Sequence, residues 1–520
     1  MRILCFSPFG YEGTVVDVEV GLRRGIPAVD IVGLADGAVK ESRERMRSAI
    51  ISSGFTFPPE RVLISLSPAD VKKEGAGFDL AVALAVLNEK ECAGRNSAEE
   101  TDRPVLVMGE LDLNGNVRPV KAVHAAASTA FQLGVRHCIV PAGNEQEAKE
   151  VRGMHVFGAE SLTEAFAALK SRSCFSSADE DADMQDTGRA DSDEADNVRF
   201  PPVEPEYEFS SISGQEHLTR ALQIAASGGH SLLVFGPPGC GKTMSLQKLP
   251  GLLPFLTKEE SQSVTRIFSI AGLLAPGAKG IRTAPFRQPH QTATIEGMCG
   301  GGIHCRPGEI SLAHNGILFL DEAAEFRTSV LQMLRVPMET GTVTLSRAGR
   351  STVFPADFQL LMSTNPCPCG NFGSAEKLCL CSARSIELYW KKFSAPLLDR
   401  IDLRIRTEQA KGGERVSKSA STAELRKQIA AAVRIQRKRG KKNARLSALE
   451  TKEFCIMTNE AETELNRAAE KNSLSQRAVS GCLKVARTIA DMKEKECIGA
   501  EEISEAVRLR IPEGADGLLL

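Results

Sequence analysis

The segment of this 520-residue sequence that most limits its fold is Gly236-Pro237-Pro238-Gly239-Cys240-Gly241-Lys242-Thr243, which follows the apolar run SLLVFG. It matches the pattern G-x-x-x-x-G-K-[ST] between a strand and a helix-compatible stretch. Glycines let the backbone curl so that its N–H groups face a phosphate, while the lysine reaches the β- and γ-phosphates and the threonine hydroxyl binds Mg²⁺. The segment therefore predicts an α/β core that binds a nucleoside triphosphate, and a chance glycine turn is the alternative.

Two carboxylates follow a second apolar strand, Gly316–Leu320, which runs directly into Asp321 and Glu322. Such a strand places one carboxylate at the Mg²⁺ shell and the next beside the attacking water. We therefore assign Asp321 to the metal and Glu322 to the polarisation of water. On its own this pattern usually marks a strand that enters a loop, and the upstream phosphate loop is what favours the catalytic interpretation.

Three further polar residues are candidates for the same chemistry. Asn365 ends the run FQLLMSTN and could orient water against the γ-phosphate, although an asparagine there also forms turns. Arg400, in LLDRID, could project across a subunit face towards a neighbour's γ-phosphate, and a surface pair with Asp399 or Asp402 is the alternative. Arg477 opens a C-terminal helix and could contact the bound nucleotide.

Periodicity and composition divide the chain into four regions. Residues 1–170 alternate strand-like and helical runs and predict a compact α/β domain, whereas residues 171–208 are acidic and predict a flexible linker. Residues 209–410 predict a second α/β unit around the phosphate loop, and residues 411–520 predict a mostly helical domain. We therefore expect a multidomain α/β protein.

The formal net charge of −2 is the sum of two oppositely charged segments and a mildly acidic remainder. Residues 173–199 carry nine acidic and two basic residues, whereas residues 411–445 carry twelve basic and two acidic residues. The acidic segment is typical of a solvated tether. The basic segment, with Arg437, Lys438 and Arg439, has few acids of its own and favours binding to DNA phosphates, with a solvated helix face as the alternative.

Four of the fourteen cysteines form the pattern C-x-C, nine residues, C-x-C: Cys367, Cys369, Cys379 and Cys381. Four thiolates could close a tetrahedral Zn²⁺ site, and reduced structural thiols are the alternative. The sequence contains no apolar run of about 18 residues that would span a membrane, and its N-terminus has no extended apolar h-region. A cytoplasmic protein with reduced thiols and no membrane contact is therefore expected.

Taken in order, the nucleotide motifs resemble those of AAA+ ATPases, and longer stretches narrow the resemblance. PGEISLAHNGILFLDEAAEF, STNPCPCG and LLDRIDL resemble the ComM/YifB family of magnesium-chelatase-like AAA+ proteins. IVGLADGAVKESRERMRSAI, SPADVKKEGAGFDLAVAL and GELDLNGNVRPVKAV resemble the Lon-protease-like N-terminal domain of that family, and LSQRAVSGCLKVARTIADM resembles its helical lid. The resemblance covers nearly the whole chain except the acidic linker.

The resemblance implies a hexameric, ATP-driven motor that translocates on or branch-migrates single-stranded or branched DNA during recombination or natural transformation. It implies ATP and Mg²⁺ as cofactors. A magnesium-chelatase-type ATPase subunit and an ATP-dependent protein remodeller or protease are the alternatives. The family gives the roles assigned above to Lys242, Thr243, Asp321, Glu322, Asn365, Arg400 and Arg477.

The Lon-like region departs from an active protease. Lon-type enzymes use a Ser–Lys dyad with the serine in a glycine-rich turn, but the corresponding stretch Lys73–Asp79 has no serine, and His124 stands near the place of the lysine. Without a hydroxyl there is no nucleophile, so no peptidase activity is expected. A second departure is Pro289-His290-Gln291-Thr292, where the family segment reads Pro-His-His-Thr, so no role that needs two histidines is expected there.

Two insertions are expected to face the central pore that the resemblance implies. Val343–Arg350 and Ser351–Phe354 predict a β-hairpin with its turn near Ala348-Gly349, and Arg347 and Arg350 near its tip suit phosphate contacts. Residues 282–306, rich in glycine, predict a flexible loop. Exposed arginines without a ligand are the alternative for each.

Overall fold

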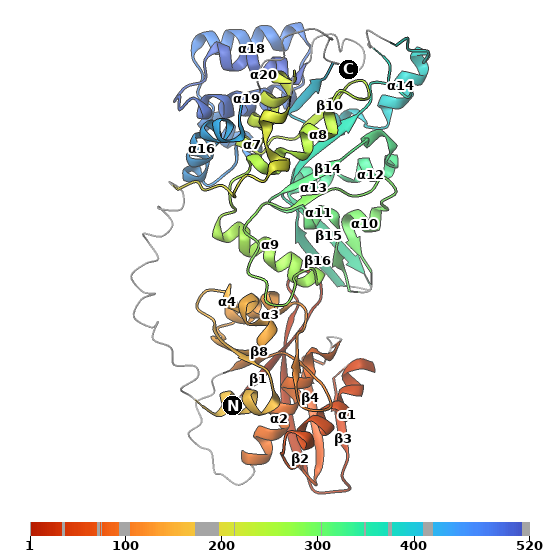
Figure 1. The fold of residues 1–520 in the computed structure, drawn as a ribbon, viewed down its shortest axis with the longest axis vertical. Coiled ribbons are helices and arrows are strands. Elements are labelled where there is room, and N and C mark those ends of the chain that lie inside the picture. The colour runs from red at the N-terminus through yellow and green to blue at the C-terminus, as the bar shows by residue number, and fades with distance from the viewer. Residues whose placement is uncertain are drawn as a thin grey trace.

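The computed structural model describes residues 2–33, 37–69, 73, 75–92, 104–171, 197–212, 214–302, 304–347, 350–372, 377–408 and 420–511 (Figure 1). Three predicted features lie wholly or largely outside these residues. They are most of the acidic linker, the first part of the basic segment and the hairpin turn at Ala348-Gly349.

The N-terminal unit is built on a seven-stranded sheet in the order β3-β4-β2-β1-β5-β8-β9, in the lower part of Figure 1. The apolar run Leu80–Leu87 belongs to helix α2 and is buried along its whole length. This helix is apolar on all sides because it lies within the core of the unit. Its strands are β1 (Ile3–Ser7), β2 (Thr14–Arg23), β3 (Val29–Val32), β4 (Arg61–Ser67), β5 (Val105–Val107), β6 (Glu110–Leu111), β7 (Val117–Arg118), β8 (His137–Pro141) and β9 (His155–Ala159). Its helices are α1 (Gly37–Ser52), α2 (Asp79–Cys92), α3 (Val123–Gln132), α4 (Glu145–Lys149) and α5 (Leu162–Lys170).

The central unit contains a five-stranded sheet in the order β11-β14-β17-β10-β18, and all its neighbouring strands are parallel. Side chains alternate between two hydrophobic clusters, since Leu232 and Val234 face one cluster and Leu233 and Phe235 face the other. The carboxyl ends of the strands share one edge of the sheet, which is where the predicted nucleotide residues follow. The strands are β10 (Leu232–Phe235), β11 (Phe286–Arg287), β14 (Ile317–Leu320), β17 (Gln359–Thr364) and β18 (Leu403–Arg406).

Helices cover both faces of this sheet. The helices around it are α7 (Glu216–Gly228), α8 (Lys242–Gln247), α9 (Lys258–Ala271), α10 (Ile295–Cys299), α11 (Glu309–Leu312), α12 (Thr328–Met333), α13 (Arg335–Thr340), α14 (Ala383–Lys391) and α15 (Ala395–Leu398). A multidomain α/β protein with an α/β unit around the phosphate loop was predicted, and the structure confirms the mixed α/β class and adds that the strands of this unit are parallel. The boundaries of the four regions stay predictions.

The structure agrees with the prediction for the first of the two insertions and differs from the prediction for the second. Strands β15 (Thr342–Arg347) and β16 (Arg350–Pro355) pair antiparallel with Arg347 opposite Arg350, which confirms the predicted hairpin. The stretch 282–306 was expected to be a flexible loop, and the short regular elements within it were not predicted. It contains β11, α10 and the strand β12 (Gly300–Gly301), which pairs with β13 (Arg306–Pro307).

The C-terminal region is helical, as predicted, and shares a hydrophobic cluster with the central sheet. Buried Ile429 and Ile489 belong to the same cluster as Val234 on β10, so the helices rest on the sheet through a continuous apolar core. The helices are α16 (Thr422–Arg439), α17 (Ala448–Phe454), α18 (Asn459–Lys471), α19 (Gln476–Met492) and α20 (Ala500–Arg510).

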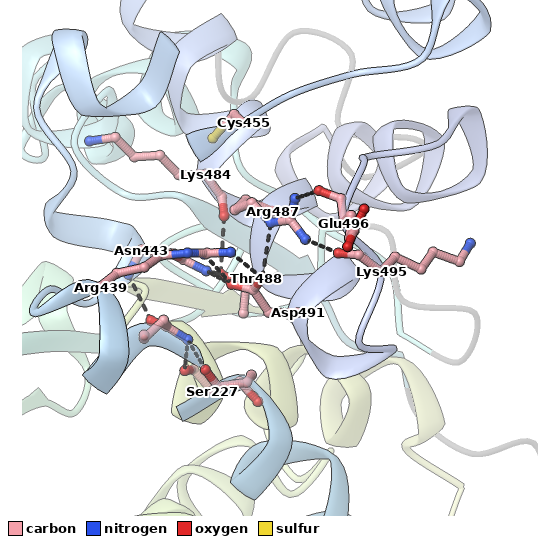
Figure 2. Close-up of polar contacts among 12 residues, drawn as sticks. Ser227, Arg439, Asn443, Cys455, Lys484, Arg487, Thr488, Asp491, Lys495 and Glu496 are labelled. Carbon is pink, nitrogen blue, oxygen red and sulfur yellow. Dashed lines mark hydrogen bonds and ion pairs between the residues drawn. The ribbon is translucent and has the colours of Figure 1, made fainter. Parts of the chain in front are cut away.

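A buried polar network joins the helices of this region to one another (Figure 2). Asp491 is fully buried and accepts hydrogen bonds from Arg439 at 2.8 and 3.0 Å, from Arg487 at 3.0 Å and from Asn443 at 2.8 Å. The Asn443 amide also donates to the Thr488 hydroxyl at 3.1 Å. One carboxylate therefore joins α16, the turn after it and α19.

One buried arginine on α9 makes several of the contacts between the N-terminal and central units. Arg266, 6% exposed, donates to the carbonyl oxygens of Tyr11 (3.0 Å) and Glu12 (3.2 Å) and to the hydroxyls of Ser128 (3.2 Å) and Thr129 (2.8 Å). Figure 1 shows the N-terminal unit directly beneath α9 and the β15–β16 hairpin. The N-terminal unit also contacts the hairpin near its turn, where the Tyr11 backbone N–H donates to the Thr352 hydroxyl at 3.0 Å. None of the helices in the described ranges is both long and apolar enough to pass through a bilayer.

Candidate nucleotide site

The phosphate loop connects β10 to α8, and its glycines are required by close contacts and by backbone conformation. A Cβ on Gly236 would lie 2.3 Å from the carbonyl oxygen of Thr407, the residue after the neighbouring strand β18, so no larger residue fits. Gly239 and Gly241 have φ angles of +80° and +79°, a region that L side chains avoid. The loop thus has the curled backbone that its sequence predicted, with α8 beginning at Lys242.

Lys242 and Asn365 lie together at the carboxyl edge of the sheet. The Lys242 ammonium donates to the carbonyl oxygens of Gly236 and Pro237 at 2.8 Å each and to Asn365 Oδ1 at 3.4 Å. Burial lowers the pKa of Lys242, and the neighbouring Cys240, Asp321 and Glu322 oppose this shift. The strand ends therefore bring the predicted phosphate-binding lysine and the predicted water-orienting amide into one place.

The residues assigned to Mg²⁺ are already in contact. The Thr243 hydroxyl donates to Asp321 Oδ1 at 2.9 Å, and the Ser363 hydroxyl on β17 donates to the same oxygen. Mg²⁺ prefers hard oxygen ligands, usually one or two carboxylates together with phosphate oxygens and water. A hydroxyl and a carboxylate beside a phosphate loop fit this ion.

Glu322 has an unusual backbone and a defined side-chain partner. Its φ of +49° places a non-glycine residue in the left-handed region, and such strain concentrates at functional sites. Its backbone N–H donates to the Ser363 hydroxyl at 3.1 Å, and its carboxylate accepts a 2.7 Å hydrogen bond from the Gln291 side chain. Gln291, which stands where the family segment has its second histidine, is therefore in direct contact with the candidate catalytic carboxylate.

Arg400 and Arg477 are brought together by the structure, but not at the phosphate loop. Both guanidinium groups form ion pairs with the Glu339 carboxylate on α13. The distance from Arg477 Nη2 to Glu339 Oε1 is 3.1 Å. Arg400 also donates to the carbonyl oxygen of Pro396 at 2.7 Å. The surface pair of Arg400 with Asp399 or Asp402 is therefore replaced by a pair with a residue distant in sequence.

The four predicted metal-binding cysteines form a cluster. Their sulfur atoms all lie within 4.8 Å of one another, and Cys367 lies 3.4 Å from Cys369 and 3.7 Å from Cys379. A Zn²⁺ ion with four bonds of about 2.3 Å to sulfur holds its ligands about 3.8 Å apart. A backbone hydrogen bond from Asn371, aided by the Cys367 thiol, lowers the pKa of Cys369 to about 6. The spacing of the sulfur atoms fits a tetrahedral zinc site.

The cluster is connected to the nucleotide residues through α14. The indole N–H of Trp390 donates to the Pro366 carbonyl oxygen at 3.0 Å, and the Tyr389 hydroxyl lies 2.9 Å from the Thr364 hydroxyl. These contacts hold the helix that follows the cysteines against the end of β17. A metal at the cysteines would therefore brace the segment on which Asn365 stands.

The predicted DNA-binding residues are not equivalent. Arg347 at the hairpin end and Lys438 on α16 are exposed, whereas the Arg350 guanidinium stacks on the Phe9 ring at 4.5 Å. Arg437 donates to the Phe255 carbonyl oxygen at 2.7 Å, and Arg439 binds buried Asp491.

The premise that the basic segment lacks compensating acids was wrong, because acids distant in sequence supply them. Arg439 pairs with Asp491 at 2.8 Å, and Lys441 pairs with Glu450 at 2.8 Å. Counting charges within the segment missed both partners. Three further pairs are Arg434 with Glu494, Lys442 with Glu260 and Arg445 with Asp357.

The Lon-like turn has neither half of a proteolytic dyad. Residues 75–79 lead into α2, where the Asp79 carboxylate accepts 2.9 and 3.2 Å hydrogen bonds from Arg45. His124, 2% exposed, has no hydrogen-bond partner for either ring nitrogen among the described residues, and burial lowers its pKa to about 4. The absence of peptidase activity stays a prediction, and a buried histidine here without a serine in residues 75–79 is consistent with it.

Three site residues were not identified from the sequence. Ser363 precedes Asn365 by two positions in a strand, so the same-face alternation of polar residues was a usable signal. Gln291 was noticed only as a departure from a family pattern. Glu339 carried no local signal, because its partners are 61 and 138 residues away.

Comparisons with known proteins agree with this geometry. The family described as magnesium chelatase, subunit ChlI, matches residues 208–415, and related families described as subunit ChlI and its C-terminal part match residues 18–144 and 419–510. Over 180 residues, the chain is 27% identical to the magnesium-chelatase 38 kDa subunit of Rhodobacter capsulatus, covering 31% of this chain and 51% of that subunit.

Two relatives match over nearly their whole length. The chain is 36% identical to protein YifB of Escherichia coli strain K12 over 513 residues, which cover 97% of this chain and 96% of YifB. It is 34% identical to competence protein ComM of Haemophilus influenzae over 511 residues, covering 97% and 96% of the two chains. The family predicted from the motifs is confirmed: this chain belongs to the ComM/YifB family of magnesium-chelatase-like AAA+ ATPases.

Proposed function

We propose that this protein is an ATP-driven motor that moves along or branch-migrates DNA during recombination or natural transformation. The observation that carries the proposal is the convergence of Lys242, Thr243, Asp321, Glu322 and Asn365 at one edge of a parallel sheet. Similarity to competence protein ComM along the whole chain supports a nucleic acid as the substrate of the motor. We further propose that it works as a hexamer in the cytoplasm and that its N-terminal unit is an inactive Lon-protease-like domain.

The roles of the nucleotide residues follow from their positions. The backbone of the phosphate loop and Lys242 would hold the β- and γ-phosphates, and Thr243 and Asp321 would hold Mg²⁺. The ion neutralises charge on the phosphate oxygens. Glu322 would accept hydrogen bonds from the attacking water, and Asn365 would orient that water. Gln291 donates to Oε2 of the Glu322 carboxylate, and because a carboxylate accepts several hydrogen bonds, Gln291 would orient Glu322 while Glu322 serves the water.

We propose that DNA binds chiefly at the exposed members of the predicted set. Arg347 ends one strand of the hairpin and Lys438 lies on the exposed side of α16. Arg350 and Arg439 would act indirectly, because the first supports the hairpin against Phe9 and the second supports the helical region through Asp491.

The proposed function is tested by measuring ATP hydrolysis with each class of candidate substrate added. We expect stimulation by single-stranded or branched DNA and none by a porphyrin or by unfolded casein. Casein should also remain uncleaved. Stimulation by the porphyrin alone would support a chelatase-type motor, and stimulation by casein alone would support a protein remodeller; either result would contradict the DNA proposal.

The DNA-binding residues can be tested in the same assay. Arg347→Ala and Lys438→Ala should each weaken DNA binding similarly across sequences and reduce the salt slope of log K by about 1. Arg467→Ala is a matched control, since Arg467 is exposed and pairs with Glu464 on its own helix. An unchanged salt slope for Arg347→Ala would remove the hairpin from the DNA contact.

We also propose that the cysteine cluster binds one Zn²⁺. Protein purified without chelators should contain about one zinc per chain, because four thiolates complete a closed structural site. Cys379→Ser should lose the metal, whereas Cys497→Ser, which changes an exposed cysteine outside the cluster, should retain it. Elemental analysis measures both, and a metal-free wild-type protein would show that the thiols are simply reduced.

A further inference from the structure

Arg400, the candidate for contact across a subunit face, and Arg477, the candidate for contact with bound nucleotide, meet on one carboxylate, that of Glu339. Arg400 pairs with one of its oxygens and Arg477 with the other, at 3.1 Å. The hydrogen bond and charge of Arg400 hold the pKa of Glu339 below its usual range, so the group is an anion. The three side chains come from α13, the turn after α15 and the start of α19.

Two guanidinium groups around one oxyanion are also the arrangement that proteins use to bind a phosphate. Here the oxyanion belongs to the protein itself. The Glu339 side chain is 54% exposed and that of Arg477 is 49% exposed, so another anion can approach the pair from solvent. Arg400 is less exposed, at 16%, and its Pro396 contact keeps it in place.

Exposed ion pairs are weak, and a carboxylate that makes two of them can be displaced by a more highly charged anion. A γ-phosphate carries more charge and more acceptor oxygens than a carboxylate. If the two arginines serve a neighbouring subunit, they must exchange Glu339 for that phosphate. The isolated subunit would then have both arginines paired with Glu339, and the assembled subunit would have them paired with the neighbour's phosphate.

We propose that Glu339 is an internal stand-in for the neighbour's γ-phosphate, which occupies Arg400 and Arg477 until a loaded subunit docks. This inference rests on the proposed ATP-driven assembly. Glu339 is thus a positioning residue that acts through the arginines and does not touch the nucleotide. It makes nucleotide-dependent assembly weaker than the arginines alone would allow.

The test compares assembly of Glu339→Gln with that of the wild type. With the non-hydrolysable analogue AMP-PNP, we expect the variant to assemble at an about fivefold lower protein concentration, equivalent to about 1 kcal/mol. With ADP, which has no γ-phosphate, the two midpoints should coincide. Sedimentation velocity over a protein dilution series measures both, and circular dichroism confirms that the variant is folded.

Two further variants make the result specific. Glu387→Gln removes an exposed carboxylate that pairs with Lys391 on its own helix, and it should behave as the wild type does. The double variant Glu339→Gln, Arg400→Ala should not assemble at the lower protein concentration expected for Glu339→Gln alone. In this variant, removal of Glu339 no longer frees Arg400 for the neighbour's phosphate. Glu339→Ala should change assembly in the same direction as Glu339→Gln.

An unchanged or raised midpoint for Glu339→Gln with AMP-PNP would overturn the inference, and a raised one would mean that Glu339 orients the arginines. A wild type that binds no nucleotide would instead overturn the proposed function. A wild type that assembles with AMP-PNP while Glu339→Gln shows no gain would leave the proposed function intact. The two failures are therefore distinguishable.

Discussion

Glu322→Gln should slow ATP hydrolysis by about 10²- to 10⁴-fold, the usual effect of removing a positioned acid–base group. The amide keeps the size of the side chain but cannot accept a proton from water. ATP binding should persist, because the phosphate contacts come from the loop and from Lys242. Turnover is measured by phosphate release and binding by a fluorescent ATP analogue.

Two companion variants separate binding from chemistry. Lys242→Ala should lose both turnover and tight ATP binding, since the lysine is the cation nearest the loop carbonyl groups. Glu325→Gln changes an exposed carboxylate three residues beyond Glu322 and should hydrolyse ATP as the wild type does. If Glu322→Gln kept more than about a tenth of the wild-type rate, Glu322 would not be the group that activates water.

The proximity of Lys242, Asp321 and Asn365 could be predicted because the motif that carries each residue follows an apolar strand. In a parallel sheet the carboxyl ends of the strands share one edge, so Lys242, Asp321 and Asn365 had to lie near one another once β10, β14 and β17 were recognised. The cysteine cluster could be predicted for a similar reason, since short spacings place paired thiols close together. Neither prediction needed information from distant parts of the chain.

Other features depended on contacts that no local pattern encodes. The first strand, β1, lies in the middle of the N-terminal sheet, yet Ile3–Ser7 is short and was not recognised as a strand. Arg439 reads as a DNA contact within its basic run, but it faces a carboxylate 52 residues away. Burial of a charge, unlike exposure, requires a specific partner, and that partner is found only in three dimensions.

Asp491 is that partner, and its removal should destabilise the helical region more than any surface change. Figure 2 shows its carboxylate between Arg439 and Arg487, and the Arg487 side chain is only 1% exposed. Asp491→Ala would leave two cations close together with their shared anion gone. Loss of one partner from a buried ion pair costs about 3–5 kcal/mol of unfolding free energy.

The loss is measured as a lowered urea midpoint, with Glu387→Ala as the surface control, expected to change the free energy by less than about 1 kcal/mol. Asp491→Asn should fall between the two, because the amide oxygen still accepts a hydrogen bond while the charge is lost. Arg487 also donates to the Glu496 carbonyl oxygen at 2.6 Å, and because this bond does not involve Asp491 we expect it to persist in each variant. If Asp491→Ala moved the midpoint no further than Glu387→Ala, the apolar cluster alone would hold the helices on the sheet.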